Sequence, residues 1–310
     1  MLRPFTGRKP RNHCEPDDRK MPAQAASLPE TGLMRAEEAG LMTGERLGQL
    51  LQTAVDAALA AAVRIRHYFG SHDLGLQKKR DGSPVTLADQ EAEAVIRDHL
   101  LTKSPVGPLD ILGEEQGFTG QGSRWRWTVD PIDGTRSFVS GIPLFGTMIA
   151  LQDMQDQLPV LGVIHLPMLG ITYAGARGQG VTRDGRVLRL PESLPIDETI
   201  IGVGDIAQFA AAGRLEDYRR LSAMHGYVRG YTDCFGHGLV ISGALGAMMD
   251  PALNPWDILP TQALIGEAGG MTLLRPSQVP GKVDSLFGNR ALVQHLAREL
   301  SFSAAAVSGR

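Results

Sequence analysis

Apolar residues recur every three or four positions across residues 44–68, with polar residues between them. This is the period of an α-helix with one buried face, and Thr43 is a residue type that caps helix N-termini. The same period recurs over residues 87–101. We therefore expect helices over residues 44–68 and 87–101.

Short apolar runs follow these two segments and predict β-strands. The expected strands lie near residues 109–112, 125–130, 144–151, 159–165, 171–174 and 271–274, and another apolar run spans 199–203. Residues 183–186 have the sequence of a hairpin turn, and residues 191–195 lie between two prolines and predict a connector. Further helices are expected over residues 206–224, 236–248 and 256–268. This mixture of helices and strands predicts the α/β (α+β) class.

Composition narrows the class of protein. The chain has 310 residues, 43% of them apolar and 21% charged, which is ordinary for a globular enzyme with a sizeable core. Its net charge of −3 gives no basic footprint for nucleic acid. No apolar run is long enough for a membrane span. The two cysteines, Cys14 and Cys234, lack the spacing of a zinc site or a disulfide framework, so a reducing, cytoplasmic location is expected.

The chain is expected to have three parts. Residues 1–42 mix Pro, Arg, Lys, Asp and Glu with little periodicity, and we expect a disordered extension there. Residues 43–195 are expected to form an N-terminal α+β lobe, and residues 196–310 a C-terminal α/β lobe.

The segment Trp127–Phe138 carries the strongest chemical signal. A strand-like run leads to Asp130, and Asp133 follows three residues later, after Pro131 and before a Gly-Thr turn. Pro131 is expected to end the strand, because it lacks an N–H and fixes φ. Two converging carboxylates repel each other unless a cation lies between them. Their oxygens suit Mg²⁺, which often binds carboxylates together with a substrate phosphate.

Other acids accompany this segment in a fixed order. Asp89 stands early in the second predicted helix, Glu114 and Glu115 follow a short apolar run, and Asp257 follows Trp256. The ordered set resembles the inositol monophosphatase superfamily over roughly residues 45 to 300. That resemblance implies a layered αβαβα sandwich with two lobes, metal-dependent phosphatase activity and a homodimer.

The resemblance also implies residue roles. It assigns roughly two or three Mg²⁺ ions to a set of metal ligands made of Glu114, Asp130, the carbonyl of Ile132, Asp133 and Asp257. It implies that the catalytic residues Thr135 and Asp89 activate water. Glu115, the third expected catalytic residue, holds a metal-bound water or is simply a solvated acid. Helix capping is an alternative explanation for Asp89 and Asp257. Thr86 and Asp89 have the spacing of a capping box. Asn254 and Pro255 are typical of a helix start, where Asp257 would complement the helix dipole.

The segments at Gly134–Phe138 and Asp233–His237 most resemble the histidinol-phosphatase branch, which predicts hydrolysis of histidinol phosphate in histidine biosynthesis. The expected substrate-binding residues are Gly134, Thr135, Arg136, Asp233, Asp250 and Asn254. In this prediction the acids of the second half accept the cationic head of the substrate. Alternatively, Asp233 and Asp250 are ordinary loop acids, and Arg136 forms a structural ion pair.

Other functions and local features stay open at this point. A phosphatase of inositol monophosphate or another small polyol phosphate, a phosphatase of a bisphosphate and a non-catalytic binder of a phosphorylated ligand are the alternatives. Cys234 and His237 are expected to serve packing. Pro260 is expected to kink the last of the predicted helices, close to Asp257.

Overall fold

Helices α2 (Gly44–Tyr68) and α3 (Leu87–Thr102) form the first layer of the computed structural model, which describes residues 42–79 and 82–303. Except for Met42, the predicted disordered extension lies outside the described residues. The Thr43 side chain caps α2 by accepting the N–H of Arg46, as predicted. Small buried alanines along α2 allow it to approach both α3 and the neighbouring sheet.

An eight-stranded sheet forms the second layer, with the strand order β10-β9-β8-β7-β6-β5-β3-β4. Its strands are β3 (Asp110–Gly113), β4 (Gly117–Thr119), β5 (Trp125–Asp133), β6 (Gly146–Asp153), β7 (Leu158–Leu166), β8 (Ile171–Ala176), β9 (Gly180–Arg183) and β10 (Arg186–Leu188). The β3–β5 pair is parallel and the other pairs are antiparallel. The predicted turn joins β9 to β10, and its central residues Asp184 and Gly185 both have positive φ. A separate hairpin, β1 (Gln77–Lys78) with β2 (Pro84–Val85), precedes α3.

A second sheet follows in the order β12-β11-β13-β15-β14. Its strands are β11 (Ile201–Val203), β12 (Val228–Gly230), β13 (Ala247–Leu253), β14 (Met271–Pro276) and β15 (Val283–Gly288). The remaining helices are α4 (Thr135–Val139), the 3₁₀ turn η1 (Ile196–Glu198), α5 (Ile206–Ala211), α6 (Leu215–Met224), α7 (Asp233–Ile241), α8 (Pro255–Glu267) and α9 (Arg290–Glu299).

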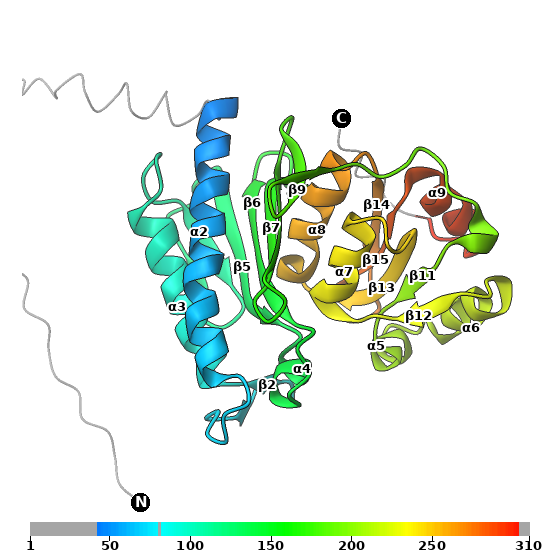
Figure 1. Ribbon diagram of the computed structural model, residues 1–310, viewed down its shortest axis with the longest axis horizontal. Helices are drawn as coiled ribbons and strands as arrows, with labels where there is room; N and C mark the ends of the chain where they lie inside the picture. Colours follow the sequence, from blue (N-terminus) through cyan, green and yellow to red (C-terminus); the bar gives the residue numbers. More distant parts are fainter. Residues whose placement is uncertain (1–41, 80–81, 304–310) are drawn as a thin grey trace, which may run out of the picture. The chain divides into compact units, whose positions relative to one another are not determined.

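Helices α7 and α8 lie between the two sheets (Figure 1). Helix α8 packs on β5 to β8 of the first sheet and on β14 and β15 of the second, while α5 and α9 pack on the outer side of the second sheet. The layers are therefore α2/α3, sheet, α7/α8, sheet and α5/α9, which confirms the αβαβα sandwich.

Helix α8 runs through Pro260 without interruption. The carbonyl of Pro260 lies so close to β7 that a Cβ at Gly162 would collide with it. This contact holds the first turns of α8, including Asp257, against the first sheet.

Two predicted helices were wrong in extent. Residues 206–224 form α5 and α6 instead of one helix, because Gly213 takes φ 66° and breaks the pattern between them. The helix expected over residues 236–248 begins at Asp233 and ends at Ile241, and Gly243 follows with φ 76°. Residues 247–253 instead form β13, because they pair with β11 on one side and β15 on the other.

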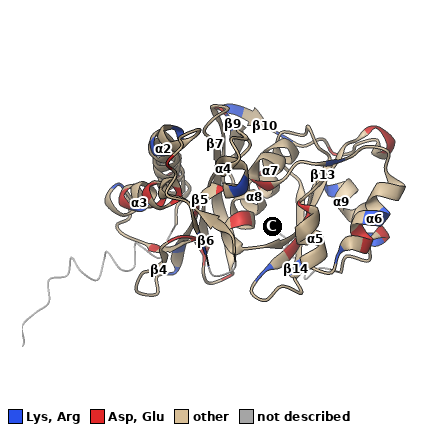
Figure 2. Cartoon of the chain, turned by 90° about the horizontal axis from the view of Figure 1, so that it is seen from below, with Lys and Arg blue, Asp and Glu red and all other residues tan. Residues whose placement is uncertain are grey.

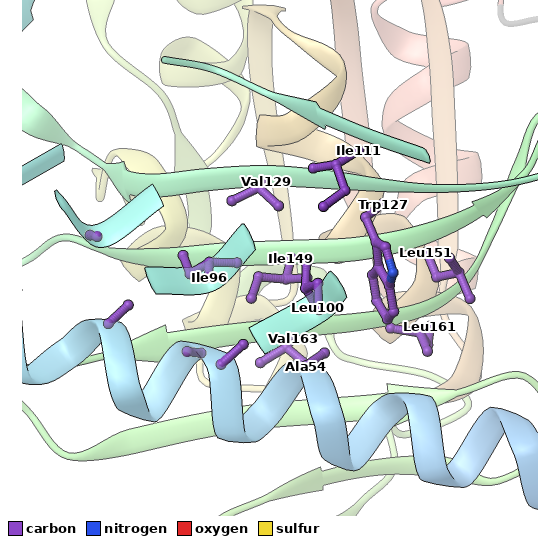
Figure 3. Packing of buried hydrophobic residues seen from close by; sticks show 14 of the residues in the cluster. Ala54, Ile96, Leu100, Ile111, Trp127, Val129, Ile149, Leu151, Leu161 and Val163 are labelled. Atoms are coloured by element: carbon purple, nitrogen blue, oxygen red, sulfur yellow. The ribbon is translucent and has the colours of Figure 1, made fainter. Parts of the chain in front are cut away.

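The largest core cluster fills the space between α2, α3 and the first sheet (Figure 3). Trp127, Leu151 and Leu161 come from neighbouring strands, and Ile96 and Leu100 of α3 point toward the same sheet face. On the outer helices α2, α3 and α6, acidic and basic residues are interspersed (Figure 2). Among the described residues, no helix is both long and apolar enough to span a membrane.

Candidate metal centre and active site

Three carboxylates converge where β5 meets the start of α8. Ligand oxygens of Asp130, Asp133 and Asp257 all lie within 4.8 Å of one another. Sequence analysis predicted that β5 stops at Pro131, and this was wrong, since the strand continues to Asp133. The β5–β6 register shifts between Asp130 and Asp133, as at a β-bulge. The pairing is interrupted only at Pro131 and Ile132, so the strand accommodates the proline and brings both acids to one place.

The turn after Asp130 is held by its own polar groups. The N–H of Ile132 donates to Asp130 Oδ1 at 3.0 Å, and the Ile132 carbonyl accepts the Thr135 hydroxyl at 3.0 Å. Gly134 follows with φ 91°, a left-handed conformation that favours glycine, and α4 begins at Thr135. The Ile132 carbonyl therefore faces the interior of this turn, beside the acids.

Asp257 is both a capping residue and a member of the acid cluster. Its Oδ2 accepts the backbone N–H of Asn254 at 2.8 Å and the Asn254 side-chain amide at 3.1 Å. Helix capping therefore accounts for the Asn254 side chain, with no need for a substrate contact. The same cap orients the Asp257 carboxylate toward Asp130 and Asp133.

Without a cation, the surroundings of this cluster disfavour the ionised form of all three carboxyl groups. Burial, followed by repulsion from Glu114 and Asp133, raises the pKa of Asp130 well above its ordinary value. Burial and repulsion from Asp233 do the same to the pKa of Asp133. Burial raises the pKa of Asp257 to about 7, with Glu114 as the next cause. A cation would relieve this repulsion, and the all-oxygen donor set fits a hard divalent ion.

Lys79 joins the predicted acid pair and was missed by sequence analysis. Its Nζ donates to Glu114 at 2.6 Å and to Glu115 at 2.7 Å. Burial alone would lower the pKa of Lys79, but attraction and hydrogen bonds to the two glutamates raise it above the ordinary value. Burial also raises the pKa of Glu115 to about 7. A lysine ammonium thus supplies positive charge beside Glu114 and Glu115.

Asp89 has two partners at once. Its Oδ2 accepts the Thr86 backbone N–H at 2.7 Å, which belongs to the capping box of α3, and it also accepts the Thr86 hydroxyl at 2.6 Å. Its Oδ1 accepts the Thr135 hydroxyl at 3.2 Å. Capping and contact with the active-site turn are therefore compatible, because each uses a different oxygen. Burial raises the pKa of Asp89 to about 6.

Asp233 approaches the turn from α7. Its Oδ2 would lie 3.0 Å from a Cβ built on Gly134, so the two chain segments are in close contact. Asp233 has φ 58°, a strained conformation for a residue other than glycine, and such strain concentrates at functional sites. Burial, followed by the charge of Asp250, raises the pKa of Asp233 to about 6. The next residue contributes its backbone, since the N–H of Cys234 donates to Asp133 Oδ2 at 2.5 Å.

Asp250 lies deeper than Asp233. It belongs to β13, so it is no loop acid, and it is 1% exposed. Its Oδ2 lies 3.2 Å from His237 Nε2, and His237 Nδ1 lies 2.7 Å from the Thr261 hydroxyl. His237 is buried between these partners and packs edge-on against Phe287, in agreement with the predicted packing role. The Oδ1 of Asp250 has no hydrogen-bond partner among the described residues.

Arg136 does not form the structural ion pair that was one of its expected alternatives. It is exposed on α4, and it makes no ion pair within residues 42–79 and 82–303. Together, the described structure brings Asp89, Thr135, Glu114, Glu115, Asp130, Asp133, Asp257 and Asp233 to one site, with Asp250 behind them.

The raised pKa values predict an unusual effect of pH on stability. A carboxyl whose folded pKa is raised stabilises the fold below its ordinary pKa, and this contribution is lost as pH rises through the folded pKa. Metal-free protein should therefore lose thermal stability between about pH 4, the ordinary pKa of a carboxyl group, and about pH 7, where the raised pKa values of Asp89, Asp257 and Glu115 end. Saturating Mg²⁺ at pH 8 should raise Tm by about 5–10 °C, since binding at 100 Kd contributes about 2.7 kcal/mol. Calorimetry across this pH range measures both effects, and a Mg²⁺ increment that does not grow with pH would contradict the acid cluster as the binding site.

Comparisons with known proteins agree with this geometry. The model of the inositol monophosphatase family matches residues 46–303. A histidinol-phosphatase from Chlorobaculum parvum is 36% identical over 220 residues, which cover 71% of this chain and 83% of that protein. An inositol-1-monophosphatase from Mesorhizobium japonicum is 33% identical over 225 residues, covering 71% and 84%. The crystal structure of the extragenic suppressor protein SuhB from Bartonella henselae has a TM-score of 0.72 and 26% identity, and covers 80% of this chain and 97% of that chain.

Proposed function

Since the chain belongs to the inositol monophosphatase family and is a phosphatase, we propose that it is Mg²⁺-dependent and hydrolyses histidinol phosphate to histidinol and phosphate. The observation that supports the metal most strongly is the convergence of Asp130, Asp133 and Asp257 within 4.8 Å. Glu114 and the Ile132 carbonyl complete the proposed ligand set. Bound Mg²⁺ would neutralise the phosphate dianion and make a water easier to deprotonate.

The chain's own groups orient and deprotonate the water. Thr135 has one hydroxyl proton, which can lie toward the Ile132 carbonyl at 3.0 Å or toward Asp89 Oδ1 at 3.2 Å. Because the Ile132 carbonyl is a proposed metal ligand, this proton would lie toward Asp89 when metal is bound, while Thr135 Oγ1 accepts a hydrogen bond from the attacking water. Because burial raises the pKa of Asp89 to about 6, this carboxylate can take up the proton near neutral pH. Backbone amides at the start of α4, after the left-handed Gly134, are proposed to hold phosphate oxygens. Glu115 is proposed to hold a further water.

The proposed substrate follows from charge. Histidinol phosphate carries a cationic amine, and Asp233 lies against the Gly134 turn with Thr232 as its hydrogen-bonding side-chain partner among the described residues. A carboxylate that has no ion-pair partner among the described residues, and that lies against the turn proposed to hold the phosphate, is a suitable acceptor for an ammonium group. The histidinol-phosphatase from Chlorobaculum parvum supports the same choice. Arg136 stays in the proposal as a residue near the substrate phosphate. Asn254 hydrogen-bonds to Asp257 and Asp250 lies 3.2 Å from His237, so these two residues are proposed to support the site from outside the substrate contact.

Inositol monophosphate is the second candidate substrate. The relative from Mesorhizobium japonicum is named for that activity, and a neutral polyol would use Asp233 only as an ordinary hydrogen-bond acceptor. A homodimer is proposed on the family resemblance. The two substrates differ in charge at the end remote from the phosphate, and this difference gives a test.

Asp233→Asn should raise KM for histidinol phosphate and change the hydrolysis of a neutral phosphate ester little. A charge-assisted hydrogen bond is worth about 1.5–3 kcal/mol, so the preference for the cationic substrate should fall by about 10- to 150-fold. Steady-state kinetics with both substrates measure the change. Asp250→Asn is the matched comparison, because Asp250 is a buried acid whose Oδ2 already faces His237. An unchanged preference in Asp233→Asn would exclude Asp233 as the acceptor of the cationic head.

A further inference from the structure

Glu93 is a buried acid that sequence analysis did not single out. It lies on α3, one helical turn after Asp89, and is 0% exposed. Its Oε2 accepts the backbone N–H of Glu115 at 2.7 Å, and its Oε1 accepts that of Gln116 at 3.1 Å. The two oxygens therefore hold two consecutive amides of the segment that carries Glu114 and Glu115.

Arg97 fixes the Glu93 carboxylate from the other side. Its Nε donates to Glu93 Oε1 at 2.7 Å, and its two terminal nitrogens donate to the Gly117 carbonyl at 2.5 Å and to the Thr119 hydroxyl at 3.2 Å. A buried carboxylate needs such a partner, because an unpaired charge in the interior is strongly destabilising. The pair thus connects α3 to the turn between β3 and β4 and to β4 itself.

Gly113 makes this approach possible. A Cβ at this position would overlap the Glu93 carboxylate and the Arg97 guanidinium. The Glu93–Arg97 pair therefore requires a glycine at position 113, directly before the two glutamates.

The same segment is also held from the first sheet. The N–H of Glu114 donates to the Val129 carbonyl at 3.0 Å, and Val129 directly precedes Asp130. Glu114 is thus attached at its own amide to β5, and at the next two amides to Glu93. The backbone of the proposed ligand is fixed relative to Asp130 on one side and relative to Asp89 on the other.

We propose that Glu93 is a positioning residue that holds the Glu114–Glu115 backbone in place and thereby sets the affinity of the site for divalent cations. This inference rests on the metal centre of the proposed function and not on the identity of the substrate. Glu93 touches neither the substrate nor the ion. Its effect passes through the backbone of residues 114–116.

Glu93→Gln keeps the size of the side chain but removes one acceptor oxygen and the charge that pairs with Arg97. The probe is Mn²⁺, titrated into the protein without substrate and followed by electron paramagnetic resonance. We expect the dissociation constant to rise about 10- to 100-fold, the usual effect of losing a group that supports a metal ligand. At Mg²⁺ concentrations that saturate the weakened site, Glu93→Gln should have most of the wild-type kcat.

Asp110→Asn is the matched control. Asp110 is 3% exposed and lies at the opposite end of β3, where it accepts the N–H groups of Gln121, Gly122 and Ser123 at 2.8–3.1 Å. It should lower Tm as Glu93→Gln does, yet leave Mn²⁺ affinity within a factor of about two of wild type. If Glu93→Gln lowers Tm and binds Mn²⁺ as tightly as wild type, the positioning role is wrong.

Two further measurements keep the inference testable. Should Glu93→Gln fail to fold, Arg97→Lys retains the charge but loses the fork to Gly117 and Thr119, and unchanged Mn²⁺ affinity in that variant would overturn the inference. Wild-type protein that binds no Mn²⁺, or Asp130→Asn that binds it as tightly as wild type, would instead contradict the metal centre of the proposed function.

Discussion

Replacing Asp130 by Asn is expected to lower kcat by about 10³-fold or more while the protein stays folded. Asp130 contributes a negative charge at the point where Asp133, Asp257 and Glu114 converge. Metal ions stabilise the transition state by several kcal/mol, and each 1.4 kcal/mol is a factor of ten in rate. Weaker or displaced binding of the ions should therefore remove most of the rate enhancement. The measurement is kcat over a Mg²⁺ series that reaches saturation.

The same substitution should not lower the stability of the metal-free protein. In the absence of an ion, the Asp130 charge is repelled by its neighbours, so a neutral amide of equal size should leave Tm unchanged or raise it. Asp156→Asn, at an exposed turn, is the control for substitution itself. Turnover by Asp130→Asn close to the wild-type rate would exclude the proposed ligand role.

The second large effect is expected at the Thr135–Asp89 pair. Asp89→Asn should lower kcat by about 10²- to 10⁴-fold, the range over which a positioned general base contributes. The substitution keeps an oxygen that can serve the α3 cap at Thr86, so stability should fall by no more than about 1 kcal/mol. Thr135→Val removes the hydroxyl that connects this acid to the turn. Its effect on kcat should be similar.

A double-mutant cycle separates catalysis from capping. If Thr135 and Asp89 act as one unit, the double variant should lose little more activity than either single variant. Rate losses that multiply across the two positions would show that they act independently. A fall in Tm with kcat preserved in Asp89→Asn would show that capping is the sole role of this acid.

The sequence allowed the acids of the site to be predicted because they lie in short segments with local signatures. Asp130 and Asp133 lie on either side of a Pro-Ile pair, Asp257 lies in the first turn of a helix, and Glu114 directly follows a strand. Local pattern alone could not reveal Lys79, since its contact with Glu114 spans 35 residues of sequence and a single lysine has no spacing signal. The Cys234 amide that holds Asp133 was equally hidden, because every residue but proline has a backbone N–H.

The fold was predictable where the apolar period was long. Helices α2 and α3 have buried residues on one face over several turns, and their bounds agree with the periodicity. The secondary-structure predictions were wrong where pairing with strands distant in sequence determined the structure. Residues 247–253 lie between β11 and β15, and this pairing overrides the helical pattern that continues from α7. Pro131 was expected to end β5, but a bulge accommodates it.

The most direct test of the account is the kcat/KM of purified protein for histidinol phosphate and for inositol 1-phosphate, with Mg²⁺ and after complete chelation. We predict phosphate release only with Mg²⁺, a kcat/KM at least about ten times higher for histidinol phosphate, and full recovery when Mg²⁺ is restored. Undiminished turnover by metal-free enzyme would contradict the metal centre. A preference for inositol 1-phosphate would contradict the proposed substrate.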